Sequence, residues 1–270
     1  MEKHTSSTFA HLPPATTIDE VIQQLQLLID DCTKTNDRLG YFAALYHKVT
    51  AKVKEGIEQN AFEDGPRMEK LDVLFANRYL LAVKQWQNHQ PLSAPWDVAF
   101  NASKKSSLLV LQHLLSGMNA HINLDLGIAA AQVSAGHAIQ DIHKDFNNIN
   151  GILGSLVLEC QNEINKISPL LSLMGLHAGN STFLMQFSIS YARDGSWAFA
   201  EDLSTKAGAD FDACIAARNL TIKKLATDLV HVKGLLRFTI WIIHLFEWKR
   251  SKKIIKVLSE SKKIFIHVNK

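Results

Sequence analysis

The segment Gln112-His-Leu-Leu-Ser-Gly-Met-Asn-Ala-His-Ile-Asn-Leu-Asp125 places many polar side chains in a stretch with helical spacing. His113, Gly117, His121 and Asp125 follow one another at steps of four. Each step drifts by about 40° on a helix with 3.6 residues per turn, so these positions share one helix face. Apolar residues fill most of the remaining surface, which is typical of a buried helix. Because a buried polar side chain must be paired or bind a ligand, the segment indicates a site.

Helical periodicity continues along almost the whole chain and predicts an all-α protein. Thr17-Ile-Asp-Glu20 has the pattern of a capping box, and no hairpin signal separates two alternating runs. We expect a compact single-domain bundle of about eight to ten helices. They are predicted at about 17–33, 41–59, 66–88, around Trp96 and Phe100, 103–134, 139–167, 181–207, 210–233, and in the tail.

The charge is unevenly distributed. Residues 231–270 carry ten Lys and Arg against two Glu, a net charge of +8, whereas the rest of the chain sums to −5. We therefore predict a flexible N-terminus at 1–16, a helical domain at 17–230 and an apolar-basic helical tail at 231–270. A basic tail is typical of a protein with an anionic partner, and no specific nucleic-acid motif accompanies it. The alternative is a solvated terminal helix rich in Lys.

The tail begins with Leu235-Leu-Arg-Phe-Thr-Ile-Trp-Ile-Ile-His-Leu-Phe-Glu-Trp248, an apolar stretch of about fourteen residues. A membrane-spanning helix needs about twenty apolar residues with few charges. Arg237, His244 and Glu247 interrupt this stretch. It is therefore expected to be a packed or interfacial helix, in contact with the bundle or with a membrane surface.

The cysteines and the N-terminus indicate the cellular compartment of the protein. Cys32, Cys160 and Cys214 are far apart and form no CxxC arrangement, which excludes a disulfide framework or a zinc ribbon. The first residues contain no apolar core segment, so a signal peptide is not expected. These features favour a cytoplasmic protein, with peripheral membrane contact through 231–270 as an additional expectation.

The central pattern suggests a metal centre. His121 and Asp125 are four residues apart and can reach one point, and His113 lies two turns earlier. Imidazole and carboxylate ligands suit Zn, Fe or Mn, and an acid from another helix, Asp72 or else Asp145, is the expected fourth ligand. Such a metal would activate water for hydrolysis or dioxygen for oxidation.

The same region can act without a metal. His121 paired with Asp125 or Asp145 would serve as a general base. The candidate catalytic residues are therefore His113, His121, Asp125 and Asp145. Gly117 between the two histidines leaves room for a ligand or for a close helix contact.

Several other polar residues are candidate substrate-binding groups. Asn119 and Asn123 form a second i,i+4 pair, which either orients a substrate or fixes helix register through hydrogen bonds. Arg78 is expected to reach a carboxylate on a neighbouring helix, either that of Asp125 or that of Asp145. A buried ion pair or a site wall is expected at Arg193-Asp194. The substrate-binding candidates are Arg78, Asn119, Asn123, Arg193 and Trp197.

Two functions remain open at this level. The first is an enzyme acting on a small molecule through a buried His/Asn/Asp site, as a metal-dependent hydrolase or oxygenase. The second is a non-catalytic helical module that binds a ligand or a membrane surface, with structural polar residues in its core. The sequence lacks Gly-rich phosphate loops and a Gly-x-Ser-x-Gly elbow, so neither function uses those sites.

Four segments carry a resemblance to a known family: 37–46, 71–80, 112–130 and 192–197. Over roughly Asp19 to Asp228 the chain resembles a family of uncharacterised, mainly bacterial proteins that is catalogued as a domain of unknown function. The resemblance implies an all-helical single domain without an assigned activity. The family pattern falls on Asp72, Arg78, Gln112, His113, Asn119, His121, Asn123, Asp125, Asp145, Arg193 and Trp197. The last forty residues lie outside it.

Overall fold

The structure is a computed structural model that describes residues 8–171 and 189–260, and these residues contain eleven α-helices and no β-strand. The prediction of an all-α fold is confirmed. Residues 181–188, where a helix was expected to begin, lie outside the described part. The α-helices are α1 (Ile18–Thr35), α2 (Leu39–Glu58), α3 (Gly65–Gln87), α4 (Ala94–Ser103), α5 (Val110–Ala120), α6 (Gly127–Val133), α7 (His143–Ile167), α9 (Ile189–Ser204), α10 (Gly208–Val230), α11 (Gly234–Phe246) and α12 (Ser251–Ser259).

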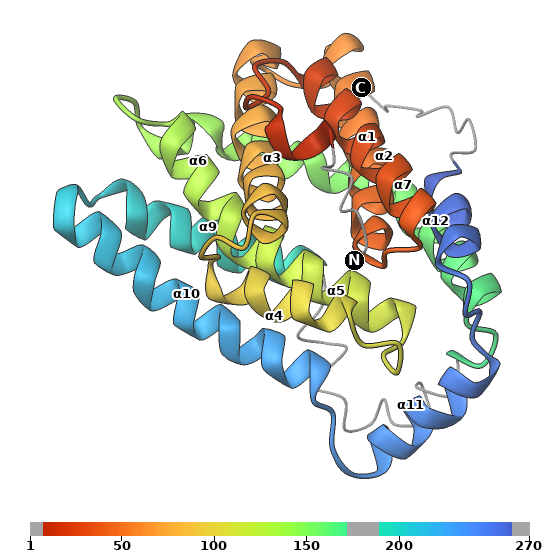
Figure 1. Ribbon diagram of the computed structural model, residues 1–270. Helices are drawn as coiled ribbons and strands as arrows, with labels where there is room; N and C mark the ends of the chain where they lie inside the picture. Colours follow the sequence, from red (N-terminus) through yellow and green to blue (C-terminus); the bar gives the residue numbers. More distant parts are fainter. Residues whose placement is uncertain (1–7, 172–188, 261–270) are drawn as a thin grey trace.

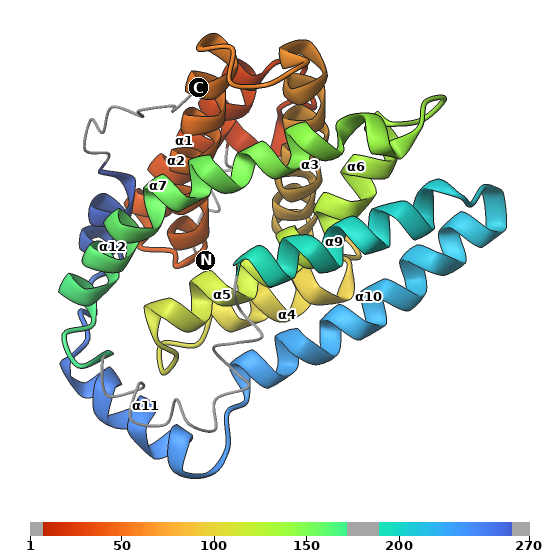
Figure 2. The same cartoon turned by 180° about the vertical axis from the view of Figure 1, so that it is seen from behind.

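Helix α5 lies at the centre of the arrangement (Figure 1). Helices α4 and α10 pack against it, as do α2 and α7. Helices α1, α2 and α3 are mutual neighbours, and α12 packs against α1 and α2. Helix α7 crosses α2, and α9 and α10 form an antiparallel pair at one edge (Figure 2). Helix α11 lies at the periphery in both views.

Helix α1 shows how local sequence sets the helix ends. The Thr17 hydroxyl oxygen accepts a hydrogen bond from the Glu20 backbone N–H at 3.2 Å, as the capping pattern predicts. The Glu20 carboxylate accepts from the backbone N–H of Thr16, the residue before the N-cap, at 2.7 Å. At the other end Asn36 adopts a left-handed φ of 56°, and its N–H bonds to the Cys32 carbonyl.

The single helix expected at 103–134 is divided in the structure. Helix α4 ends at Ser103, and α5 begins only at Val110. The start of α5 is fixed by the Gln112 side chain, whose Oε1 accepts from the Leu109 N–H at 3.1 Å. A π-helical turn, η2 (His121–Leu126), then separates α5 from α6. Such turns are rare and occur frequently at functional sites.

Part of the basic tail belongs to the main core. Ile254, Ile255 and Leu258 of α12 are buried in the same apolar cluster as residues of α1, α2 and α3. The Tyr41 hydroxyl donates to the Ser251 hydroxyl at 3.1 Å. The second helix of the tail is therefore packed on the bundle.

Gly117 is a point of close contact between α5 and α2. A Cβ atom at this position would lie 2.6 Å from Cγ of Phe42. The Phe42 ring cannot move away easily, because it packs against the rings of Tyr46, Tyr79 and Trp96. Of the two roles considered for Gly117, the structure shows the close helix contact.

Replacing Gly117 with alanine should therefore destabilise the protein by about 1–3 kcal/mol, the usual cost of adding a methyl group to a packed interior. Urea unfolding monitored by circular dichroism measures this. Gly154→Ala on α7 is the matched control, because nothing lies within 4 Å of a Cβ there. Equal stability of the two variants would contradict the packing argument.

Candidate functional site

The described residues line a cavity of about 330 Å³ between α2, α3, α5, η2, α7 and α9. Its wall is mostly apolar, with leucine, isoleucine, valine, methionine and phenylalanine side chains. A concave apolar site with a few polar groups is the usual form of a small-molecule pocket. The polar or titratable lining residues are Tyr46, Asp72, His121, Cys160, Gln161 and Arg193.

His121 lies in an aromatic enclosure at the cavity wall. Its ring stacks on Phe75 with centroids 3.6 Å apart and meets Tyr46 edge-on at 4.3 Å. Burial lowers the pKa of His121, although the Asp125 carboxylate acts in the opposite direction. The neutral imidazole is therefore the favoured form at pH 7.

The Asp125 carboxylate holds three elements together. Its Oδ1 accepts from Nε of Arg78 on α3 at 2.9 Å, and its Oδ2 accepts from Nε1 of Trp96 on α4 at 2.8 Å. Nδ1 of His121 is 3.7 Å from Oδ2, beyond ordinary hydrogen-bond distance. Of the two carboxylates considered for Arg78, the structure pairs it with Asp125.

The four expected metal ligands do not converge. Within residues 8–171 and 189–260, no group of three His, Cys, Asp or Glu side chains is placed to hold a metal ion. His113 and His121 line different cavities, because positions eight residues apart on a helix are rotated by about 80°. The oxygens of Asp125 are already engaged, and Asp72 lies on the wall of the large cavity. The expected metal centre is thus not supported by the geometry of these residues.

His113 is a buried packing residue. Its ring meets Tyr41 edge-on with centroids 5.7 Å apart. Burial lowers the pKa of His113 to about 3, and the charges of Arg38 and His244 act in the same direction. His113 is therefore neutral at pH 7, and it does not line the large cavity.

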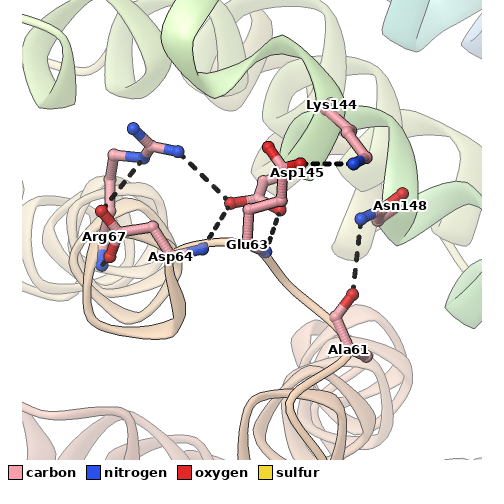
Figure 3. Close-up of polar contacts among 7 residues, drawn as sticks. All are labelled: Ala61, Glu63, Asp64, Arg67, Lys144, Asp145 and Asn148. Carbon is pink, nitrogen blue, oxygen red and sulfur yellow. Dashed lines mark hydrogen bonds and ion pairs between the residues drawn. The ribbon is translucent and has the colours of Figure 1, made fainter.

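Asp145 binds the loop between α2 and α3 (Figure 3). Its Oδ1 accepts from the Glu63 backbone N–H at 2.7 Å, and its Oδ2 accepts from the Asp64 N–H at 3.0 Å. Nη2 of Arg67 lies 3.4 Å from Oδ2. Its oxygens hold this loop and Asp145 does not line the cavity, so the structure shows a structural clamp at this position.

The amide stripe of the central segment connects helices. Nε2 of Gln112 donates to the Leu229 carbonyl at 3.0 Å, and Nδ2 of Asn119 donates to the Ile222 carbonyl at 3.1 Å. Nδ2 of Asn123 donates to Oδ1 of Asn119 at 3.0 Å. The first two bonds fix α5 against α10, and the third joins η2 to α5. Asn119 and Asn123 do not line the cavity, so the substrate-binding role expected of them has no geometric support.

Arg193 is a buried cation on the cavity wall. Only 4% of its surface is exposed, and its guanidinium carbon lies 4.3 Å from the centroid of the Phe146 ring. Nη2 donates to the Phe146 carbonyl, while Nε has no hydrogen-bond partner among the described residues. Burial lowers the pKa of Arg193 to about 10, so the side chain remains charged at pH 7.

The ion pair considered for Arg193 and Asp194 is not formed, since Asp194 is exposed and no described carboxylate bridges to Arg193. Trp197 packs one turn further along α9. Its ring lies 5.0 Å from that of Phe146 and 4.5 Å from that of His143. Trp197 supports the α7–α9 contact and does not line the cavity.

Asp72 is the buried carboxyl group of the cavity. Its Oδ2 has no hydrogen-bond partner among the described residues. Burial raises the pKa of Asp72 to about 7, and the charge of Glu69 adds to this effect. Burial also raises the pKa of the neighbouring Tyr46 hydroxyl, and the Asp72 charge contributes.

Sequence reasoning missed the contribution of α7. This helix supplies a long row of cavity-lining side chains, from Phe146 to Ile164. It is held to α2 by the buried Lys48, whose Nζ lies 2.7 Å from Glu163 and 3.3 Å from Glu159. The signal available in the sequence was the pair of glutamates four residues apart on an otherwise apolar face.

Residues 18–232 match a family of unknown function, DUF5995. The chain belongs to this family. The DUF5995 segment runs from α1 to the end of α10, so it includes every element of the cavity and ends just before α11. Neither the curated proteins nor the solved structures gave a match.

Removing the Asp145 clamp should destabilise the protein without altering the cavity wall. We expect Asp145→Ala to cost about 2–4 kcal/mol, because two backbone donors and Arg67 lose a charged acceptor. Chemical denaturation measures this cost. Asp141→Asn on the exposed neighbouring turn is the control, and it should change stability by less than about 0.5 kcal/mol.

Asp72 should make stability depend on pH. The folded-state pKa of Asp72, about 7, lies above its unfolded value. Its contribution to the free energy of unfolding is therefore present at low pH and is lost as the pH rises from about 4 through 7. Asp72→Asn should gain stability relative to the wild type between pH 5 and 8, on the order of 2–4 kcal/mol. Urea unfolding at the two ends of this pH range tests this prediction. Asp228→Asn, which removes an exposed carboxylate, should parallel the wild type.

Proposed function

We propose that the protein binds an apolar small molecule that carries an anionic group, such as a long-chain carboxylate. The apolar part would occupy the cavity between α2, α3, α5 and α7, and the anionic group would pair with Arg193. The observation that carries this proposal is a buried, charged arginine without an ion-pair partner among the described residues, on a mostly apolar cavity wall.

The buried charge of Arg193 favours an anionic ligand over a neutral one. A buried charge without a counter-charge costs several kcal/mol, and a ligand that supplies the counter-charge recovers part of this energy. A guanidinium group presents several N–H donors to a planar carboxylate and makes charge-assisted hydrogen bonds. The free Nε of Arg193 is such a donor. The cavity volume is within the range of small-molecule pockets, about 300–1,000 Å³.

The test compares two ligands that differ only in the end group. Isothermal titration calorimetry would measure binding of myristate and of 1-tetradecanol to the wild type and to Arg193→Gln. We expect the wild type to prefer myristate. Arg193→Gln should weaken myristate binding by roughly 10- to 100-fold, as expected for a lost charged hydrogen bond, and leave the alcohol nearly unchanged.

A second variant tests whether the ligands bind in the cavity. Leu153→Trp on α7 places a larger side chain on the cavity wall and should weaken both ligands. Leu220→Trp on the exposed face of α10 is its control. Equal binding of both ligands to all variants, or binding of neither ligand to the wild type, would sink the proposal.

Acid–base chemistry on the bound ligand is a second candidate function. One observation favours it: Asp72 is a buried carboxyl group on the same cavity wall, and burial raises its pKa to about 7. Carboxyl groups with such values can take and return protons near neutral pH. Turnover of a bound ligand that is lost in Asp72→Asn, with binding retained, would establish this function. Metal-dependent hydrolysis or oxidation is not part of the proposal, because the described residues bring no three metal ligands together.

A further inference from the structure

Helix α11 presents an apolar face to solvent. Four of its exposed side chains recur at steps of three and four, a fifth follows directly after them, and all five have 55–67% of their surface accessible. The rings of Phe238 and Trp241 stack on this face with centroids 5.8 Å apart. The apolar face of α11 is formed by Leu235, Phe238, Trp241, Leu245 and Phe246.

The opposite side of α11 fixes its orientation. Ile240 and Ile243 are buried in a small cluster with Leu109, and Leu111 packs against the same cluster. The carboxylate of Glu247, just after the helix, accepts from the Val110 backbone N–H at 3.1 Å and from the Ser168 hydroxyl. The helix is thus attached to the body by one side, and its apolar face is directed outward.

Positive charges surround this face. Lys233 and Arg237 are exposed at the start of α11, and Lys249 and Arg250 are exposed directly after it. Glu247, which lies between these two pairs in the sequence, is buried in the contact just described. The charge of 231–270 is +8, whereas the remainder of the chain is acidic. Four basic residues therefore flank the helix that carries the apolar face.

We propose that α11 docks in the plane of an anionic membrane surface. Its apolar face would enter the interface, and the flanking Lys and Arg side chains would lie at the level of the lipid phosphates. Amphipathic helices with aromatic residues on one face and basic residues beside it bind membranes in this way. Tryptophan is also enriched at the boundary between lipid and water.

Two other uses of this face fit less well. A symmetric contact between two copies would bring the same cations of both chains together, which is unfavourable. Insertion across the bilayer is not indicated, because no single helix of the described residues is long and apolar enough. Helices α10 and α11 satisfy that requirement only as a pair, and the chain bends by 61° between them.

The family match ends at residue 232, two residues before α11 begins. The docking surface is thus attached to the end of a domain that already contains the whole cavity. The inference rests on α11 and its charges and does not require a ligand in the cavity.

Co-sedimentation with phospholipid vesicles tests the inference on the full chain. The two probes are phosphatidylcholine vesicles and equimolar phosphatidylcholine–phosphatidylserine vesicles. We expect the wild type to bind the anionic vesicles and to leave the neutral ones largely unbound. The double variant Phe238→Ser, Trp241→Ser should lose binding, whereas Leu81→Ser, Leu220→Ser removes two exposed leucines elsewhere and should retain it.

Charge variants separate the electrostatic from the apolar contribution. Lys233→Gln with Arg237→Gln should weaken binding to the anionic vesicles by roughly 30-fold, from about 1 kcal/mol for each basic residue near the surface. Lys223→Gln with Lys224→Gln removes two exposed cations from α10 and serves as the control. The fluorescence of Trp241 provides a direct readout: a blue shift on vesicle addition should be present in the wild type and reduced in Trp241→Phe.

Three results would overturn the inference. The wild type could fail to bind either kind of vesicle, or it could bind as well after the Phe238 and Trp241 substitutions as before. Light scattering could instead show a dimer that these substitutions dissociate, with no vesicle binding, and the face would then be a contact between two copies.

Discussion

The buried carboxylate of Asp125 is the interaction on which the central arrangement depends. It accepts hydrogen bonds from Arg78 on α3 and Trp96 on α4 while it lies in the π-helical turn η2. Three elements that are distant in the sequence therefore meet at two oxygen atoms. Losing a donor would leave a buried charge partly uncompensated, so these elements must keep their relative positions. This constraint places the ring of His121, one turn earlier, among the aromatic side chains that close one side of the cavity.

The polar residues of the central segment mainly attach α5 and η2 to the neighbouring helices. Gln112 and Asn119 attach α5 to α10, and Gly117 allows α2 to approach. The side of α5 that remains apolar faces the cavity. The chemistry of the site consequently lies mostly on other elements, with Asp72 on α3 and Arg193 on α9. Among the polar residues of the central segment, His121 is the one that lines the cavity.

Helix α7 completes the enclosure because it is anchored near its start and towards its end. Asp145 binds the loop before α3, and the buried Lys48 on α2 joins Glu163 in the last part of α7. The proposed pocket is thus bounded by helices whose positions are fixed by buried charges. Leu111 connects the pocket to the proposed membrane surface, since it lines the cavity and also packs against the cluster that holds α11. A ligand with an apolar tail and a membrane-facing helix would suit one another chemically.

The sequence by itself determined the all-α class, the cap of α1, the burial of the central segment and the family resemblance. These properties depend on periodicity and on contacts between residues close in the chain. Only the tertiary structure decided that Arg78 pairs with Asp125, that His113 and His121 separate, that Asp145 holds a loop and that Arg193 faces a cavity. The physical reason is that spacing shows which side chains share a helix face but not what lies opposite that face. An arginine on an apolar helix has the same sequence signature whether it meets a carboxylate or an empty pocket.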